Sequence, residues 1–338
     1  MQSSDRRPAA PAPGEILILK PSSLGDVVHT LPCAAWLRRV YPQAKIRWLV
    51  NTEWAPLLEG NPCLDEVIEF PRRKFRGVAG VLRIAPWARQ LRERVQPDLI
   101  LDYQGLLRSA LIAKLCRQNG CRVLGLSDAR EGARFFYDQA ADVSGCDHAV
   151  DRYLALTRLA LGAEAGEATP ELEWPLPKGS LPAGFDPTEP FVALHPFSRG
   201  AGKSLTIEQV QEFCAALAPL RVVLVGRAEA TSVESILSIP STTDLLNRTT
   251  LPELIAVLRR AAWIVSVDSG PMHIASALTG RLISIHTWSD PAKVGPYRPD
   301  AWVWQAGQLF PQRERRQADV ARKVANFAEL AEFVRAQL

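Results

Sequence analysis

The stretch ILILKPSSLGDVVHTLP, residues 16–32, decides how this chain folds. It begins with four apolar residues that favour a β-strand and ends in residues with helical spacing. Between the two parts, a turn of small residues holds one carboxylate, Asp26. A buried strand that leads into a helix through such a turn points the turn at the carboxyl edge of a parallel sheet, where open α/β folds bind ligands. The stretch therefore predicts an α/β fold with Asp26 at its binding edge.

Strands and helices alternate along the rest of the first half, which indicates βαβ units and a parallel sheet. The predicted strands cover 15–19, 45–50, 66–70, 98–102 and 121–125. The predicted helices cover 27–39, 86–95, 106–117, 129–138 and 148–162.

The alternation restarts in the second half of the chain, so we expect two doubly wound halves facing a central cleft, a natural place for a small-molecule site. The predicted strands there cover 191–195, 221–225, 243–246, 262–267 and 281–286. The predicted helices cover 206–217, 230–237, 251–260 and 271–278.

Proline marks the boundary between the two halves. Six prolines fall between residues 165 and 190, and proline at this density stiffens a connection and prevents helix formation. The last segment of the chain has apolar residues at helical spacing. The predicted organisation is a disordered tail over 1–14, a first domain over 15–168, a linker over 169–190, a second domain over 191–317 and a closing helix over 318–338.

The composition is that of an ordinary globular protein. The 338 residues are 47% hydrophobic and 22% charged, and the formal net charge of +4 suits an anionic ligand or a membrane surface but is too small to indicate nucleic acid. The six cysteines are scattered without a CxxC pair, which predicts free thiols and no zinc site. Residues 1–14 lack the apolar core of a signal peptide and no long apolar run is present, so we expect a cytoplasmic protein.

Asp26 has two interpretations. An acidic residue in the first turn of a helix is favoured by the helix dipole, so Asp26, Ser22 or Ser23 could simply cap the helix. Alternatively, a carboxylate at a sheet edge can act as a general base and accept the proton of a hydroxyl nucleophile. Gly25 beside it leaves room for a sugar to approach the backbone.

A second candidate site is SVDSGPMH, residues 266–273, which follows an apolar strand and opens a helix. Proline suits the first helical turn, and the backbone N–H groups of a helix start bind phosphate well. Asp268 would orient the turn or meet a hydroxyl. His273 could touch a diphosphate or a sugar, or it could be a packed core histidine.

The third candidate is HPFSRGAGK, residues 195–203, directly after a predicted strand. The loop lacks the full spacing of the phosphate-loop pattern GxxxxGK[ST], so an ATPase of that type is excluded. A flexible loop that brings Lys203 and Arg199 to a leaving diphosphate makes physical sense, because negative charge builds up there. The alternative is a solvated loop with ordinary surface cations.

The fourth candidate is basic. Residues 72–76, RRKFR, follow the third predicted strand, and the turns near Gln104 and Arg130 follow the fourth and fifth strands. All of them could line the same edge as Asp26, and arginine suits bidentate recognition of a carboxylate or phosphate. For the run 72–76, a solvated or lipid-facing loop is the alternative.

Taken together, these motifs resemble the lipopolysaccharide heptosyltransferases, glycosyltransferase family 9, over about residues 15–305. KPSSLGDVVHTLP and SVDSGPMH carry the resemblance most specifically, and the first is closest to the heptosyltransferase I type. The resemblance implies a GT-B fold of two Rossmann-like domains, with the acceptor on the first and the nucleotide sugar on the second. It implies inverting, metal-independent transfer from ADP-L-glycero-D-manno-heptose to the Kdo/heptose inner core of a glycolipid, without a cofactor.

The site residues follow from these motifs and from the resemblance. We expect Asp26 to be catalytic. The residues expected to bind the donor are Lys203, Ser198, Arg199, Asp268, Ser269, Gly270 and His273. The residues expected to bind the acceptor are Ser23, Gly25, Arg72, Arg73, Gln104 and Arg130.

Two segments depart from the family pattern, one directly after Lys203 and one at 286–291. A transferase of the same family that uses another nucleotide sugar or acceptor is therefore the alternative. A nucleotide-binding dehydrogenase is disfavoured because no strand leads into G-x-G-x-x-G. A catalytically silent sugar-nucleotide-binding protein is the third class, and the carboxylate at Asp26 argues against it. Peripheral contact with the inner membrane stays open, since 75–94 could form an amphipathic helix on lipid or against the core.

Overall fold

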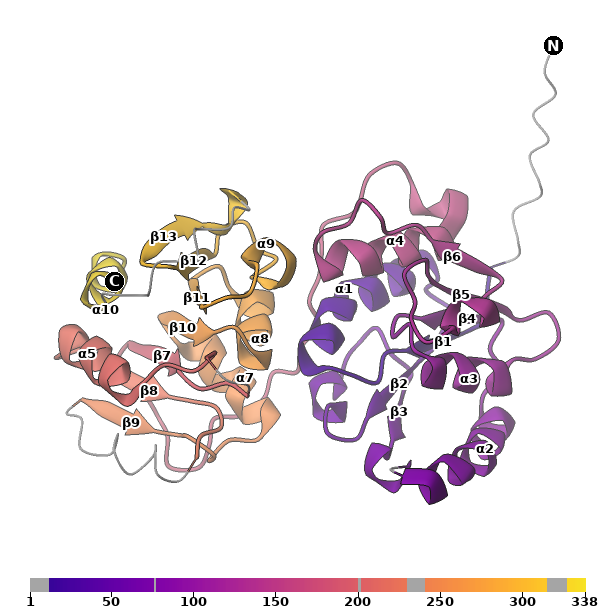
Figure 1. The fold of residues 1–338 in the computed structure, drawn as a ribbon, viewed down its shortest axis with the longest axis horizontal. Helices are drawn as coiled ribbons and strands as arrows, with labels where there is room; N and C mark the ends of the chain where they lie inside the picture. Colours follow the sequence, from indigo (N-terminus) through magenta and orange to yellow (C-terminus); the bar gives the residue numbers. More distant parts are fainter. Residues whose placement is uncertain (1–11, 76, 200–201, 230–240, 315–326) are drawn as a thin grey trace, which may run out of the picture. The chain divides into compact units, whose positions relative to one another are not determined.

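The computed structural model describes residues 12–75, 77–199, 202–229, 241–314 and 327–338 (Figure 1). Most of the predicted tail over 1–14, the predicted helix over 230–237 and the first part of the closing helix over 318–338 lie outside the described residues. The chain divides into two compact units, Met1–Pro175 and Leu176–Leu338. The division falls within the stretch for which the sequence predicts a linker.

The first unit is built on a parallel sheet with strand order β3-β2-β1-β4-β5-β6 (Figure 1). Its central strands are continuous apolar runs, as expected of parallel strands that helices cover on both faces. The strands are β1 (Glu15–Leu19), β2 (Lys45–Asn51), β3 (Glu66–Phe70), β4 (Leu99–Asp102), β5 (Arg122–Leu126) and β6 (Gln139–Ala141).

Helices α1 and α4 pack on each other, and α2 packs on α3. Because side chains alternate along a strand, Leu17 and Leu19 join the core with Leu91 of α2 and Ile112 of α3. The helices are α1 (Leu24–Val40), α2 (Gly77–Arg94), α3 (Leu107–Cys116) and α4 (Ala149–Leu161), with short 3-10 turns η1 (Ala55–Leu58), η2 (Arg72–Phe75), η3 (Ala133–Phe136) and η4 (Gly162–Ala165).

The second unit has strand order β13-β12-β11-β10-β7-β8-β9, parallel except for the pair β12–β13. Its strands are β7 (Phe191–His195), β8 (Arg221–Leu224), β9 (Thr242–Asp244), β10 (Trp263–Val267), β11 (Leu282–His286), β12 (Trp302–Gln305) and β13 (Gln308–Pro311). Its helices are α5 (Ile207–Leu217), α7 (Leu251–Arg260), α8 (Gly270–Leu278), α9 (Pro291–Val294) and α10 (Phe327–Ala336), with the 3-10 turn η5 (Gln312–Glu314). The closing helix α10 packs on α5 and contributes Phe327 and Leu330 to the core of this unit.

The structure corrects several expected elements. The predicted helix over 129–138 is the short turn η3, followed by the edge strand β6, and three residues give too little alternation to reveal a strand. The hairpin β12–β13 was not predicted, although Ala306 and Gly307 form a two-residue turn with φ of 53° and 75°, which is typical of such hairpins. Helices α1 and α2 also begin earlier than predicted, at Leu24 and Gly77. The prediction of six free cysteines is confirmed.

Each sheet has a switch point, where successive connections leave in opposite directions along the sheet. In the first unit it lies between β1 and β4, and in the second between β7 and β10. Ligands bind in the crevice outside the carboxyl ends of strands at such a point. The loops after these four strands are therefore where the functional residues are to be sought.

Candidate active site

Asp26 lies in the first turn of α1, three residues after the N-cap Ser23. Its Oδ2 atom accepts a hydrogen bond from the Ser23 backbone N–H at 3.0 Å and a second from the Ser23 hydroxyl at 2.7 Å. This is the reciprocal bond of a capping box, and it places a negative charge at the positive end of the helix dipole. Asp26 thus helps to cap the helix, as one interpretation of the sequence expected, and the contact with Ser23 fixes the direction of its carboxylate.

The other carboxylate oxygen, Oδ1, faces α4. It accepts a hydrogen bond of 2.6 Å from the Tyr153 hydroxyl, and the Lys20 ammonium lies 3.6 Å away. The ammonium itself donates to the Tyr103 carbonyl oxygen at 3.0 Å and lies 4.6 Å from the centre of the Tyr153 ring. At 3.6 Å, Lys20 acts on Asp26 as a nearby charge rather than as a close donor.

These neighbours keep Asp26 ionised. Burial raises the pKa of Asp26, but the Lys20 charge and the hydrogen bonds from Tyr153 and Ser23 outweigh burial and hold the pKa well below its usual range. Burial also lowers the pKa of Lys20, against the opposing charges of Asp26 and Asp102. Two of the described hydrogen bonds are accepted by Oδ2 and one by Oδ1, and Lys20 forms an ion pair with Oδ1.

Asp26 lines a cavity of about 420 Å³ at the switch point of the first unit. The wall is strongly polar and carries three cations, Lys20, Arg130 and Arg152, against the carboxylates of Asp26 and Asp128. Arg152 forms an ion pair with Asp128. A sugar that carries an anionic group suits a cavity with this excess of positive charge.

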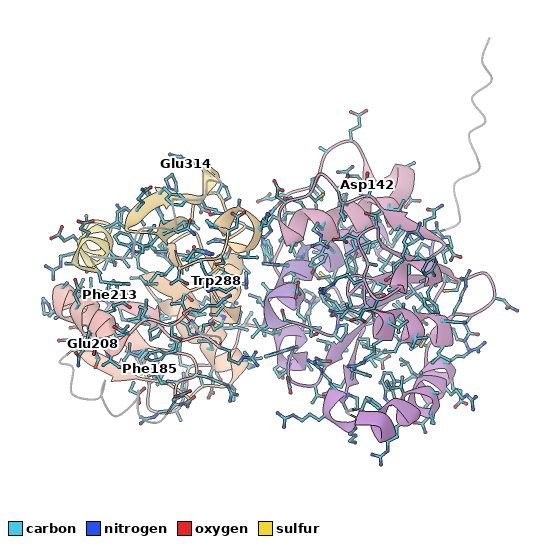
Figure 2. All side chains as sticks on the ribbon, in the orientation of Figure 1. Asp142, Phe185, Glu208, Phe213, Trp288 and Glu314 are labelled. Atoms are coloured by element: carbon cyan, nitrogen blue, oxygen red, sulfur yellow. The ribbon has the colours of Figure 1, made fainter. Side chains whose placement is uncertain are left out.

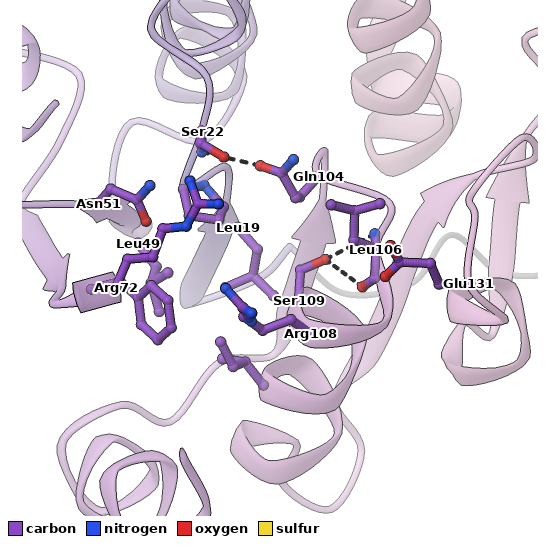
Figure 3. A pocket seen from close by; sticks show the side chains of 13 residues that line it. Leu19, Ser22, Leu49, Asn51, Arg72, Gln104, Leu106, Arg108, Ser109 and Glu131 are labelled. Carbon is purple, nitrogen blue, oxygen red and sulfur yellow. Dashed lines mark hydrogen bonds between the residues drawn. The ribbon is translucent and has the colours of Figure 1, made fainter. Parts of the chain in front are cut away.

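A second cavity of about 250 Å³ adjoins the first, and Gln104 lines both (Figure 3). The Ser22 backbone N–H donates to Gln104 Oε1 at 3.1 Å, which ties the loop after β1 to the loop after β4. The floor is apolar, and two arginines, Arg72 and Arg108, reach into it (Figure 3).

Buried Asp102 holds the loop that presents Gln104. Its carboxylate accepts hydrogen bonds from the backbone N–H groups of Gln104 and Gly105 at 3.0 and 3.1 Å. It also accepts from the hydroxyls of Ser109 at 2.8 Å and Tyr137 at 2.7 Å. Burial of Asp102 raises its pKa despite these donors. Full satisfaction of a buried carboxyl group makes the loop rigid.

Five of the six residues predicted for the acceptor lie close to Asp26 or to the two cavities. Arg72, Gln104 and Arg130 line a cavity, Ser23 bonds to Asp26, and Gly25 is buried in the first turn of α1. Arg73 differs. Its side chain is 81% exposed and contacts Glu53, because the η2 turn directs successive side chains to different sides.

Sequence reasoning missed three residues around Asp26. Lys20 lies within the stretch 16–32, directly after β1. This position alone could have suggested a role near Asp26. Tyr153 and Arg152 lie on α4, and they reach Asp26 and its cavity only because α4 packs on α1. A contact across 127 positions leaves no local signal in one sequence.

In the second unit, the loops after β7 and β10 meet through Lys203 and Asp268. The Lys203 ammonium donates to Asp268 Oδ2 at 2.8 Å and lies 4.9 Å from the centre of the Trp288 ring, which Figure 2 labels. Burial raises the pKa of Asp268, but Lys203 and nearby histidines outweigh it and lower that pKa overall. The Ser198 hydroxyl lies 3.4 Å from the Asp268 carbonyl oxygen. The structure therefore brings the two predicted donor loops together.

The start of α8 lies beside this pair. Ser269 is its N-cap residue, Gly270 opens the helix, and half-buried His273 is in its first turn. The Ser269 hydroxyl lies 3.2 Å from Nδ1 of His195, and burial lowers the pKa of His195 to about 4, so this ring is neutral at pH 7. The exposed Arg199 is the member of the predicted donor set for which the described residues give no side-chain partner.

Two doubly wound units, with polar residues at each switch point, define the GT-B class of glycosyltransferase folds. The solved structure of the Escherichia coli heptosyltransferase WaaC with ADP shares this fold: it has a TM-score of 0.74 at 23% identity and covers 96% of this chain and 100% of its own. The Escherichia coli ADP-heptose heptosyltransferase II gives a TM-score of 0.74 at 21% identity, with 96% and 98% covered.

The sequence relationship is more specific. The model of glycosyltransferase family 9 (heptosyltransferase) matches residues 84–325. The lipopolysaccharide heptosyltransferase 1 of Pseudomonas aeruginosa is 30% identical over 83% of this chain and 81% of its own length. The Escherichia coli protein of that name is 27% identical over 86% and 93%. The chain therefore belongs to glycosyltransferase family 9 and is a glycosyltransferase.

Proposed function

We propose that this protein transfers heptose from ADP-L-glycero-D-manno-heptose to the Kdo/heptose inner core of lipopolysaccharide, with inversion at the anomeric carbon. The observation that carries the proposal is Asp26, an ionised carboxylate at the wall of a polar cavity. The names of the relatives support the substrate class, since several are lipopolysaccharide heptosyltransferases.

In the proposed reaction, an acceptor hydroxyl attacks the anomeric carbon of the nucleotide sugar. The proton of this hydroxyl passes to Oδ1 of Asp26 as the new carbon–oxygen bond forms. The bond from the anomeric carbon to the diphosphate breaks, and ADP leaves with the electron pair. The arginines of the two cavities, Arg72, Arg108, Arg130 and Arg152, would hold the anionic acceptor.

Negative charge that develops on the leaving ADP needs a positive partner. We assign this role to Lys203 and to the start of α8 at Gly270, where helix N–H groups favour phosphate. In the free protein, Asp268 neutralises Lys203. Donor binding would therefore redirect Lys203 from the carboxylate to the diphosphate. Asp268 could then accept a hydrogen bond from a hydroxyl of the nucleotide sugar.

A panel of nucleotide sugars tests the proposal directly. We expect nucleotide release in the presence of a Kdo-bearing acceptor with ADP-heptose, and little with UDP-, GDP- or dTDP-linked sugars. The measurement is coupled detection of the free nucleotide. Faster release from another donor would support the alternative, a transferase of this family with a different nucleotide sugar. Binding of NAD would point instead to a dehydrogenase.

Transfer is expected to be independent of a divalent metal. Among the described residues, no group of three or more histidine, cysteine, aspartate or glutamate side chains is placed to hold a metal ion. We expect the initial rate to stay within experimental error when EDTA is added, because Lys203 and the α8 start supply the positive charge. A rate that collapses in EDTA and returns with Mg²⁺ would contradict this part of the proposal.

Tyr153→Phe should change the pH dependence of the reaction. Loss of the hydroxyl removes a hydrogen bond to the ionised form of Asp26, so the pKa of Asp26 rises toward its usual value. The base must be ionised, and activity is lost as the pH falls through its pKa. The acidic limb of kcat/KM should therefore move to higher pH.

The matched control for this experiment is Tyr103→Phe. It removes a buried hydroxyl that bonds to Thr157 at 2.8 Å and leaves Asp26 untouched. A variant that only loosened the packing of α4 would lower the rate without shifting the profile. An unshifted acidic limb in Tyr153→Phe would exclude Tyr153 from tuning the base.

The proposed acceptor belongs to a membrane lipid, so we place the reaction at the cytoplasmic face of the inner membrane. No helix in the described part of the chain is long and apolar enough to cross a membrane. Within 75–94, Leu91 is buried in the core and Trp87 packs against the same cluster. These described side chains of α2 therefore pack against the protein core, as one interpretation of this segment expected.

A further inference from the structure

Two adjoining elements of the first unit expose apolar side chains. Of its described residues, the large hydrophobic side chains that are exposed are Leu107, Leu111 and Phe135. Phe135 is 92% exposed. The first two lie on α3 and the third on η3, and these two elements contact each other. An aromatic side chain held almost wholly in water, with other apolar groups on the adjoining element, is typical of an interaction site.

Basic side chains lie on or next to the same two elements. Arg108 and Lys114 extend from α3, Arg130 precedes η3, and Arg134 lies within it; all four are exposed. None of these four side chains forms an ion pair with a carboxylate in the described ranges of the chain. We define the α3–η3 patch by these apolar and basic members: Leu107, Arg108, Leu111, Lys114, Arg130, Arg134 and Phe135.

The geometry of α3 gathers part of the patch on one face. Leu107, Leu111 and Lys114 follow the i, i+4, i+7 spacing that places side chains on the same side of a helix. The Lys114 ammonium lies 5.5 Å from the centre of the Phe136 ring. The acidic neighbour Glu131 is engaged, because its Oε2 accepts a hydrogen bond from the Leu107 backbone N–H at 3.2 Å. The patch therefore combines apolar groups with an excess of positive charge.

The patch is continuous with the proposed acceptor site. Arg108 lines the smaller cavity, and Arg130 lines the larger cavity together with Asp26. If this patch faces a membrane, the acceptor site opens beside the surface that carries a lipid-linked acceptor. A lipid substrate requires the membrane-binding surface to lie next to the acceptor site. A protein partner could bind at any distance from that site.

We propose that the α3–η3 patch docks on a lipid surface that bears anionic headgroups. Phe135 enters the headgroup region, where aromatic side chains are favoured. Lys114 and Arg134, which line neither cavity, are attracted to the negative surface potential. This deepens the proposed function and rests on it, since a glycolipid acceptor is the reason for the enzyme to work at a membrane.

The test is vesicle co-sedimentation of the full chain, without donor or acceptor. Wild-type protein should sediment with vesicles of phosphatidylcholine and phosphatidylglycerol, weakly with pure phosphatidylcholine, and less at high salt. Phe135→Ser should weaken the partition coefficient about tenfold, as expected for loss of one buried aromatic group. Arg134→Ala should weaken it about fivefold.

Two variants of the second unit serve as matched controls. Val294→Ser removes another exposed apolar side chain, and Arg248→Ala removes another exposed cation. Neither should change vesicle binding. Circular dichroism would establish that every variant is folded. Transfer to a water-soluble, delipidated acceptor should be unchanged in Phe135→Ser, because this side chain lines neither cavity.

Several results would overturn the proposal. One is wild-type protein that does not sediment with anionic vesicles. Another is Phe135→Ser and Arg134→Ala variants that bind these vesicles as tightly as wild type. A dimer that Phe135→Ser converts to a monomer, with vesicle binding unaltered, would show that the patch joins two copies of the chain. Failure of the proposed function would be seen separately, as loss of heptosyl transfer with vesicle binding intact.

Discussion

Asp26→Asn should lower kcat by about 10²–10⁴-fold, the contribution of a positioned general base. The amide keeps an oxygen that can accept the Ser23 hydrogen bonds, so the first turn of α1 is preserved. The amide cannot take a proton at neutral pH, and the acceptor hydroxyl would have to attack without assistance. Single-turnover rates with saturating donor measure the effect, and the dissociation constant for ADP-heptose should stay near the wild-type value.

Asp26→Ala is the companion to this variant. It removes both the base and the reciprocal capping bond, so it should also lose about 1 kcal/mol of stability, which thermal unfolding would detect. A kcat for Asp26→Asn within a few-fold of wild type would show that another group takes the proton. Equal losses of kcat and of donor affinity would show that Asp26 holds the donor and is not the base.

Lys203→Ala should reduce kcat/KM about 10²-fold, in the range found when one donor to a developing negative charge is removed. The loss should be divided between weaker donor binding and slower turnover. The reason is that Lys203 is assigned to the diphosphate both in the donor complex and in the transition state. Removal of the lysine also leaves Asp268, whose side chain is 9% exposed, without its cationic partner. The pKa of Asp268 should then rise, since burial alone raises it.

Two comparisons isolate the role of Lys203. Lys203→Arg keeps the charge and should retain more activity than the alanine variant. Lys293→Ala removes a lysine that lies near Asp290 on α9, with a 63% exposed side chain, and should leave the kinetics unchanged. Unchanged kinetics in Lys203→Ala itself would remove this lysine from the reaction.

The architecture was predictable because the signals that decide it are local. Apolar runs such as residues 16–19 and 263–267 are bounded by turns, and the helices between them have regular apolar spacing. The missed strands are at the edges of the sheets. The strand β6 is short, and the hairpin of β12 and β13 turns on Ala306 and Gly307, a pair that sequence reasoning did not weigh as a turn signal.

The candidate site was predictable where one motif contains it. Asp26 and the loop at 266–273 each stand in a short strand–turn–helix segment, and the switch points bring such segments to the binding edge. Tyr153 could not be predicted, since it depends on how α1 packs on α4. The pairing of Lys203 with Asp268 also required the fold, because it joins loops 65 positions apart.

The most direct test of the central claim is mass spectrometry of the acceptor after incubation with ADP-heptose and the enzyme. Wild-type protein should add a single heptose to a Kdo-bearing acceptor. The Asp26→Asn variant, at equal concentration and with the donor bound, should leave the acceptor mass unchanged over the same interval. An acceptor that gains heptose equally with both proteins, or with neither, would contradict the account of Asp26 as the base of a heptosyl transfer.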